Sequence, residues 1–259
     1  MLKIENVCKT FNAGTVNEKK ALQNLNLHLK PGEFVTVIGG NGAGKSTMLN
    51  ATAGVFGVES GKITIDGVDV THLPEYKRAK YIGRVFQDPM MGTAANMWIE
   101  ENLALAARRG KPRTLRSGIT KAEREEYREA LKILDLGLED RMTSKVGLLS
   151  GGQRQALTLL MATLQKPKLL LLDEHTAALD PKTADKVLET TNEIVSGSNL
   201  TTLMITHNMK DALRLGNRLI MMDAGRIIYD VSGEEKKHLT VKDLLEKFKI
   251  ENDRMLLSE

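Results

Sequence analysis

The chain has 259 residues and a formal net charge of +4, and 41% of its residues are hydrophobic. These values fit one large domain with an ample core, and the mild positive charge does not require a nucleic-acid partner. The single cysteine, Cys8, excludes an internal disulfide framework and suits a reducing compartment. We see neither a secretion signal nor an uncharged apolar run near the ~20 residues of a membrane span, so we expect a soluble, cytoplasmic protein.

The chain is expected to begin with β structure and then to alternate between strands and helices. Residues 2–7 and 25–29 alternate between apolar and polar side chains, which is typical of strands with one wet face. Residues 34–38 are an apolar, β-branched run that predicts a buried strand, and residues 48–53 form a predicted helix that Gly54 can end. The later predicted elements are strands at 62–66, 82–86, 169–172, 203–207, 219–222 and 227–229, with a hairpin turn at 223–226 and a short helix at 240–248.

A helix-rich segment interrupts this alternation. Residues 97–109 contain many helix formers, and a second helix opens with a capping box at Thr120. The basic residues 108–116 have no interleaved aromatics, so we interpret them as a solvated loop; contact with nucleic acid or anionic lipid is the alternative. We place a helical subdomain at residues 88–165 within a single domain of residues 1–259.

A glycine-rich stretch joins the buried strand 34–38 to the helix that follows. It contains Gly39, Gly40, Asn41, Gly42, Ala43, Gly44, Lys45, Ser46 and Thr47. The glycines let backbone N–H groups point inward, and the helix N-terminus adds partial positive charge. Lys45 can reach the β- and γ-phosphates, and the Ser46 hydroxyl can ligate Mg²⁺. A flexible linker is the alternative, but the strand, the glycine density and the Lys-Ser pair favour a site for a nucleoside triphosphate.

Two carboxylates follow the four-leucine strand 169–172. Because ligands gather at the carboxyl ends of parallel strands, Asp173 and Glu174 should meet the phosphates. Asp173 would join the Mg²⁺ shell, and Glu174 would orient the attacking water or take its proton. The alternative is a solvent-exposed turn with two ordinary acids.

The segment 149–153, Leu-Ser-Gly-Gly-Gln, precedes an amphipathic helix. Ser150 is a natural N-cap, and the two glycines leave the helix N-terminus open to an anion. Taken alone, a plain capped helix is the favoured interpretation. A second anion-binding device is useful in one chain if it caps the γ-phosphate held by another copy.

Together, these stretches resemble the ATP-binding subunits of ATP-binding cassette (ABC) transporters over about residues 1–230. Six motifs occur in the order of that family. They are the Walker A loop, the Q loop, the signature, the Walker B strand, the D loop and the switch histidine, at 39–47, Gln87, 149–153, 169–174, 177–180 and His207. No guanine-recognition motif of a GTPase follows, and a small-molecule kinase would have no use for the signature.

The resemblance implies a role for each matched residue. Phe11 would stack on adenine, and Asp180 would hold the D loop. The implied catalytic residues are Glu174, His207, Gln87 and Lys45, and the implied Mg²⁺ ligands are Ser46, Gln87 and Asp173. From a second copy, the phosphates would also meet Ser150, Gly151, Gly152 and Gln153. Two positions depart from the family: Gly40 and His175 stand where a proline is usual. We interpret His175 as tolerated, with tuning of activity by pH as the alternative.

The resemblance implies an α/β P-loop NTPase core with an N-terminal antiparallel β element and an inserted helical subdomain. The implied function is ATP hydrolysis in a homodimer that closes around two ATP and two Mg²⁺ and drives transport through separate membrane permease subunits. The protein would lie on the inner face of the cell membrane through the permease. A separate solute-binding protein is expected as a further partner, and nucleic acid is not.

The short C-terminus resembles importer subunits, in particular those for amino acids or related solutes. A soluble ABC ATPase of cofactor assembly, or of another non-transport process, is the alternative. Met90, Met91 and Met97, together with Trp98, predict the docking site of the permease, because flexible thioethers suit a groove that accepts a partner helix. For Trp98, burial in the subdomain core is an equal alternative.

Overall fold

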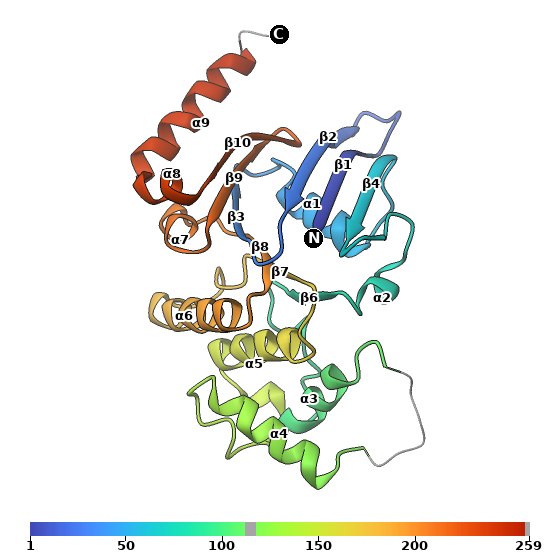
Figure 1. The fold of residues 1–259 in the computed structure, drawn as a ribbon, viewed down its shortest axis with the longest axis vertical. Helices are drawn as coiled ribbons and strands as arrows, with labels where there is room; N and C mark the ends of the chain where they lie inside the picture. The colour runs from blue at the N-terminus through green and yellow to red at the C-terminus, as the bar shows by residue number, and fades with distance from the viewer. Residues whose placement is uncertain (112–117, 257–259) are drawn as a thin grey trace. The chain divides into compact units, whose positions relative to one another are not determined.

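The computed structural model describes residues 1–111 and 118–256, and for residues 249–256 it describes the helical backbone without the side chains. Its described part consists of two compact units (Figure 1). The first contains residues 1–75 and 201–259, and the second contains residues 76–200.

The first unit contains two sheets. In the antiparallel sheet the strand order is β2-β1-β4-β5, with β1 (Leu2–Phe11), β2 (Lys19–Leu29), β4 (Ser60–Ile65) and β5 (Val68–Asp69). In the other, β3 (Phe34–Gly39) lies between two parallel neighbours, β8 (Thr201–Ile205) and β9 (Arg218–Asp223), and β10 (Arg226–Ser232) pairs antiparallel with β9. The helices of this unit are α1 (Lys45–Ala53), α7 (Met209–Arg214), α8 (Gly233–His238) and α9 (Val241–Leu256).

The second unit contains one parallel strand pair and several helices. Its strands are β6 (Ile82–Val85) and β7 (Leu169–Asp173), which α2 (Glu75–Arg78) precedes in the chain. Its other helices are α3 (Ile99–Ala107), α4 (Lys121–Lys132), a 3₁₀ turn (Val146–Leu148), α5 (Gly151–Thr163) and α6 (Pro181–Gly197). The strand–helix alternation predicted from the sequence is therefore confirmed in both units.

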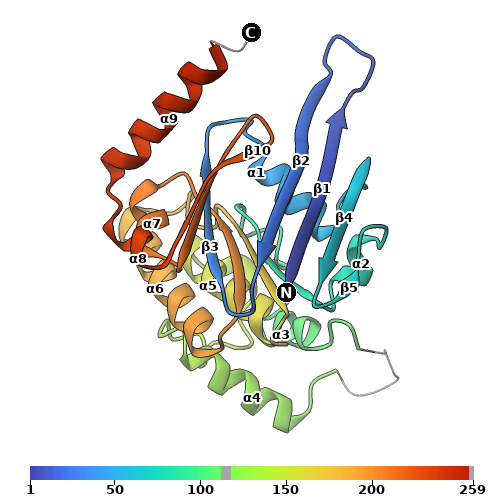
Figure 2. The same ribbon diagram turned by 45° about the horizontal axis from the view of Figure 1, so that its top comes forward.

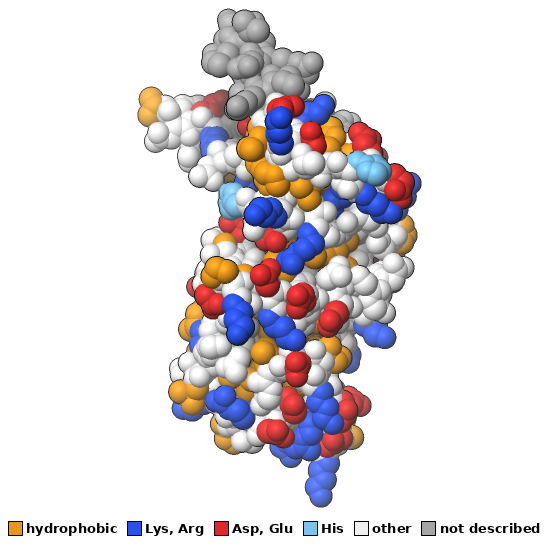
Figure 3. Space-filling view, turned by 90° about the vertical axis from the view of Figure 1, so that its left-hand side faces the viewer, with side chains coloured by type: hydrophobic (Ala, Val, Ile, Leu, Met, Phe, Trp, Pro, Cys, Tyr) orange, Lys and Arg blue, Asp and Glu red, His pale blue; other side chains and the backbone are white. Residues whose placement is uncertain are grey.

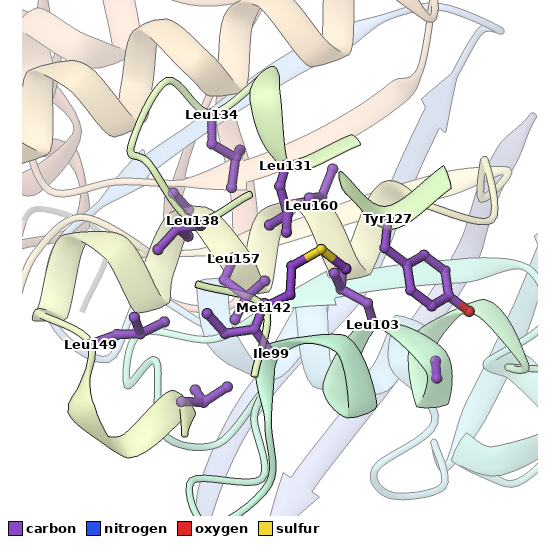
Figure 4. Packing of buried hydrophobic residues seen from close by; sticks show 13 residues of the cluster. Ile99, Leu103, Tyr127, Leu131, Leu134, Leu138, Met142, Leu149, Leu157 and Leu160 are labelled. Atoms are coloured by element: carbon purple, nitrogen blue, oxygen red, sulfur yellow. The ribbon is translucent and has the colours of Figure 1, made fainter. Parts of the chain in front are cut away.

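A separate hydrophobic cluster holds three helices of the second unit together, α3, α4 and α5 (Figure 4). Leu103 of α3, Leu131 of α4 and Leu157 of α5 all point into it and have no exposed surface. Met142, from the segment before the 3₁₀ turn, fills the space between them. Because a methionine is unbranched and flexible, it can fill such an irregular gap. These helices thus have a core of their own.

Three elements predicted from the sequence are shorter than those observed in the structure. The predicted strands 2–7 and 25–29 are parts of a longer hairpin, in which Thr10 pairs with Lys20 and Phe11 with Lys19 (Figure 2). In this outer arm Thr10 and Phe11 are half-buried and Lys19 and Lys20 are exposed, so the arm lacks the apolar alternation that the prediction required. The helix predicted at 240–248 continues to Leu256, because no glycine or proline ends it.

The interpretation of residues 108–116 as a solvated loop was wrong for Arg108 and Arg109, whereas Gly110 and Lys111 are exposed as expected. Arg108 forms an ion pair with Glu123 at 3.1 Å, and Arg109 donates a hydrogen bond to Ala162 O at 3.0 Å. Burial lowers the pKa of Arg109 below its usual value. Residues 112–117 lie outside the described residues.

A buried lysine fastens α8 to the rest of the first unit. Lys236 is 3% exposed, and its ammonium donates hydrogen bonds to the carbonyl oxygens of Leu215 and Gly216. Burial lowers its pKa from 10.5 to about 8, because the charged form loses its hydration. The folded protein therefore releases this proton at a lower pH than the unfolded chain does.

We expect this lysine to make the protein more stable as the pH rises. Between pH 8 and 10.5, the unfolded chain holds a proton that the folded protein has lost, so the free energy of unfolding increases with pH. From pH 7.5 to 9.5 the gain should be ~2 kcal/mol relative to Lys236→Met, which shares every other titrating group. Urea unfolding of both proteins at the two pH values measures it. Parallel pH profiles of the two proteins would show that Lys236 titrates normally.

Candidate nucleotide site

The glycine loop of the first unit connects β3 to α1. Gly39, Gly42 and Gly44 have positive φ angles of 157°, 82° and 97°. A Cβ atom on Gly39 would lie 2.3 Å from Met222 O, and one on Gly44 would lie 2.6 Å from Ala21 O. Backbone oxygens cannot give way by this much, so glycine is required at both positions.

Gly40 is different, because an added Cβ would meet no atom within 4 Å and its φ is not positive. At Gly40, where the family that the sequence resembles often has a proline, the first carbon of a side chain would therefore lie in open space.

Lys45 opens helix α1 and is 5% exposed. Its ammonium donates hydrogen bonds to Gly39 O at 2.7 Å and to Gly40 O at 2.9 Å. These carbonyls hold a positive charge against the loop, close to the N-terminus of α1. Phosphate oxygens form stronger, charge-assisted bonds with an ammonium than neutral carbonyls do. The loop is thus arranged to receive a polyphosphate.

Two further predicted residues belong to the same unit. His207 is exposed and follows β8, which pairs parallel with β3 so that Ile205 lies beside Val37. It therefore lies at the sheet edge from which the glycine loop leaves. Phe11 ends β1, and its ring meets the edge of Phe56 with the centroids 5.3 Å apart.

The second unit brings another set of predicted residues to one edge. Strands β6 and β7 are parallel, with Val85 beside Leu172, so Gln87 and the pair Asp173–Glu174 follow neighbouring strand ends. Glu174 has a φ of 46°, in the left-handed region that non-glycine residues seldom occupy. Such strain is typical of functional turns. Sequence reasoning identified these three residues but not the conformation of Glu174.

Sequence reasoning missed Arg84. This arginine stands in the apolar strand β6, and its guanidinium lies 4.5 Å from the centroid of the Phe86 ring. Its Nη2 is 3.8 Å from Asp173 Oδ2, and both side chains are mostly buried. An enclosed positive charge next to Asp173 attracts its carboxylate and helps to fix the direction of that group. The signal was a charged residue in an otherwise apolar strand.

The signature segment forms the reciprocal cap of α5. Ser150 Oγ accepts a hydrogen bond from Gln153 N at 3.2 Å, and Gln153 Oε1 accepts one from Ser150 N at 3.1 Å. The predicted N-cap is thus confirmed. Ser150 and Gly151 are exposed, whereas Gly152 is buried, and a Cβ there would lie 2.0 Å from Thr183 Cγ2 of α6. The exposed pair is the part that a partner can reach.

His175, the other departure from the family, is 1% exposed. Burial lowers its pKa from 6.5 to about 4, because the enclosed ring loses the hydration of its charged form. It is therefore neutral around pH 7. Tuning of activity through His175 near neutral pH is not supported.

The described residues contain no group of three or more His, Cys, Asp or Glu side chains placed to hold a metal ion. The predicted Mg²⁺ ligands are instead a hydroxyl, an amide and a carboxylate, from Ser46, Gln87 and Asp173. All three offer oxygen donors, which Mg²⁺ prefers. Magnesium commonly keeps several waters and binds substrate phosphates, so a dense protein cage is not needed.

Charged side chains of both signs lie on the surface of the protein. Figure 3 shows one face of the molecule, where basic and acidic side chains are interspersed over the described residues. Such a face differs from the basic stripe that is typical of nucleic-acid binding.

Within the described ranges, no helix has both the length and the apolar character that crossing a bilayer demands.

The sequence model of ABC transporters matches residues 22–177. The chain belongs to the ABC transporter family. It is 47% identical over 248 residues to the tyrosine transport ATP-binding protein of Clostridioides difficile (strain R20291), which covers 96% of this chain and 98% of that protein. It is 33% identical to the energy-coupling factor transporter ATP-binding protein EcfA2 of Clostridium tetani (strain Massachusetts / E88), with 95% and 83% covered.

Solved structures agree with this assignment. The dimeric, post-hydrolysis cassette MJ0796 bound to ADP and Pi is 32% identical and has a TM-score of 0.76, with 90% of this chain and 98% of that chain covered. The predicted α/β P-loop fold of an ABC ATPase is therefore confirmed. The chain is the ATP-binding subunit of an ABC transporter, and its enzymatic activity is ATP hydrolysis.

Proposed function

We propose that this ABC ATPase drives uptake of an amino acid or a related solute through separate membrane permease subunits. The observation that carries the proposal is the end-to-end identity of 47% with a protein that is named for tyrosine transport. A solute-binding protein would deliver the solute from outside, and the ATPase would work on the inner face of the cell membrane. A soluble ATPase of cofactor assembly is the competing function, and the similarity to transport subunits argues against it.

The residues of the two units have complementary tasks in this proposal. The glycine loop and Lys45 bind the phosphates of ATP, while Phe11 stacks on the adenine. Glu174 orients the attacking water or takes its proton, and His207 contacts the γ-phosphate. When bound by Ser46, Gln87 and Asp173, Mg²⁺ would neutralise charge on the β- and γ-phosphates.

We further propose that two copies share each site. Ser150 and Gly151 are exposed at the N-terminus of α5, a position from which they can meet the γ-phosphate held by a second copy. The dimeric form of MJ0796 supports this arrangement. Within one ABC domain of residues 1–259, the helical subdomain would span residues 88–165, and the separate cluster of Figure 4 supports that division.

The proposed function can be tested by reconstitution. A candidate permease and a candidate solute-binding protein from the same genome are reconstituted with this chain in proteoliposomes. Uptake of radiolabelled tyrosine and other amino acids is measured with ATP on the side of the membrane that the ATPase faces. We expect uptake of one amino-acid class that depends on ATP and on Lys45. ATP hydrolysis by a chain that never associates with a permease would instead favour the cofactor-assembly function.

The permease is proposed to dock on the exposed residues after Gln87. Met90 is 44% exposed, Met91 68% and Trp98 43%, so the alternative of burial in the subdomain core is wrong for Trp98. Arg154 of α5 donates hydrogen bonds to Met90 Sδ and to Gly147 O. Arg154 therefore connects this docking surface to the helix that carries the signature. Pressure on the docking surface can thereby be passed to α5.

We expect Met90→Glu and Met91→Glu to abolish co-purification with the permease, because each replaces an apolar thioether at the interface with a carboxylate that is costly to desolvate. The loss should be at least about thirtyfold in affinity, which is the size of a removed interface anchor. Basal ATP hydrolysis by the isolated subunit should remain. Leu105→Glu is the matched control, since Leu105 is 55% exposed on α3. Permease binding that survives both methionine changes would place the docking surface elsewhere.

A further inference from the structure

A buried histidine directly follows Glu174. The Nε2 atom of His175 lies 3.1 Å from the Oγ1 atom of Thr191, a buried residue in the middle of α6. The Thr191 hydroxyl donates its own proton to Val187 O at 2.7 Å. A hydroxyl has one proton, so toward the histidine Thr191 can only accept. The proton of the neutral imidazole must therefore be on Nε2, and His175 is the donor.

This assignment determines the other side of the ring. Nδ1 is buried and has no hydrogen-bond partner among the described residues. With the proton on Nε2, Nδ1 is an unprotonated acceptor. Burying an acceptor without a hydrogen bond costs less free energy than burying a charge without a partner. The N–H bond to Thr191 is thus the directional contact that fixes the ring.

The same segment of chain is held again at the start of α6. Two tight turns lead out of the strand, with Ala177 N bonded to Glu174 O at 2.9 Å and Leu179 N bonded to Thr176 O at 3.1 Å. Asp180 then caps α6 by accepting a hydrogen bond from Thr183 N at 3.1 Å. Since α6 is a continuous helix of 17 residues, the cap and Thr191 are two fixed points on one rigid element.

Glu174 needs such support because its backbone is strained. A φ of 46° on a residue with a full side chain persists only where the surroundings hold it. The adjacent residue, His175, stabilises this conformation through the hydrogen bond from its Nε2 atom to Thr191. Release of this bond would let Glu174 relax toward an ordinary conformation and would turn its carboxylate.

We propose that His175 is a positioning residue: by its Nε2–H bond to Thr191, it fastens the turn of Glu174 to α6 and so directs the Glu174 carboxylate for hydrolysis. This inference rests on the proposed role of Glu174. The contacts that bind ATP are separate from this bond. Its loss should therefore slow the chemical step and leave nucleotide binding intact.

The test uses two matched pairs in the full chain. Thr191→Val removes the acceptor at nearly constant shape, and Thr191→Ser keeps it. His175→Leu removes the donor, and His175→Gln keeps an N–H donor near the position of Nε2. For Thr191→Val and His175→Leu we expect kcat to fall about ten- to a hundredfold, the cost of a misplaced catalytic group, with an unchanged KM for ATP. Thr191→Ser and His175→Gln should retain most of the wild-type kcat.

Two results would overturn the inference. One is a wild-type kcat in Thr191→Val. The other is a loss in which kcat, ATP affinity and melting temperature decline together, because that pattern marks a merely structural contact. If Thr191→Val does not fold, Thr191→Cys replaces it, since a thiol is a poor acceptor of similar size. Wild type and Glu174→Gln are assayed in the same series, and wild-type turnover in Glu174→Gln would instead contradict the proposed function itself.

Discussion

Replacing Glu174 with glutamine is expected to slow ATP hydrolysis by ~10²–10⁴-fold while ATP binding is retained. Glutamine has the size of glutamate but cannot accept the proton of the attacking water, and its uncharged oxygen orients that water less strongly. The bound nucleotide would then persist unhydrolysed, and the protein should accumulate as an ATP-bound dimer. Steady-state ATPase rates, equilibrium ATP binding and size-exclusion chromatography with ATP measure the three parts of this expectation.

Glu189→Gln is the matched control for this change, because Glu189 is an exposed residue of α6 in the same unit. It should leave both hydrolysis and binding unchanged. Near-wild-type turnover in Glu174→Gln would remove Glu174 from the mechanism. A loss of ATP binding in that variant would instead mean that the carboxylate contributes to the nucleotide site before the chemical step.

The second large effect is recovery of activity on mixing two inactive proteins. Lys45→Ala removes the ammonium that the glycine loop holds, so it should fail to bind nucleotide. Ser150→Arg puts bulk and charge at the exposed N-terminus of α5, so it should block a shared site. If each site joins the loop of one copy to the signature of the other, a mixed dimer keeps one intact site. Equal mixing should then restore about a quarter of the wild-type sites.

The matched control carries both changes on one chain and is mixed with the wild-type protein. A mixed dimer of that kind has no intact site, so mixing should lower the activity of the wild type rather than raise it. ATPase assays over a series of mixing ratios distinguish the two arrangements. Hydrolysis by dilute, monomeric Ser150→Arg would contradict the shared site, since that protein keeps its own loop.

The elements that sequence predicted well are those with local causes. The strand–loop–helix of residues 34–53 has an apolar run, glycines at positive φ and a glycine end at Gly54, which is the left-handed C-cap of α1. The hairpin turn 223–226 likewise has Ala224 and Gly225 at positive φ. Where neighbouring residues determine the backbone conformation, the sequence alone is enough to predict the element.

The parts that sequence could not predict depend on distant partners. The outer arm of the β1–β2 hairpin is held by backbone pairing between Lys19 and Phe11 and has no apolar pattern to reveal it. The same is true of the site. Each motif was found by its local spacing, but Arg84 beside Asp173 and His175 against Thr191 are contacts between separate elements. Only a fold that brings those elements together defines them.

The hydrophobic cluster shared by α3, α4 and α5 has a mechanical consequence (Figure 4). Protein interiors packed around buried leucines are dense and resist compression, so they transmit strain instead of absorbing it. In the proposed docking arrangement, a push from the permease on Met90 would reach α5 through the Arg154 hydrogen bond, and the cluster would couple α5 to α3 and α4. Since Leu157 of α5 belongs to that cluster, the signature at the N-terminus of α5 would move together with the packed helices. The three packed helices would therefore pass a displacement on to the signature instead of absorbing it.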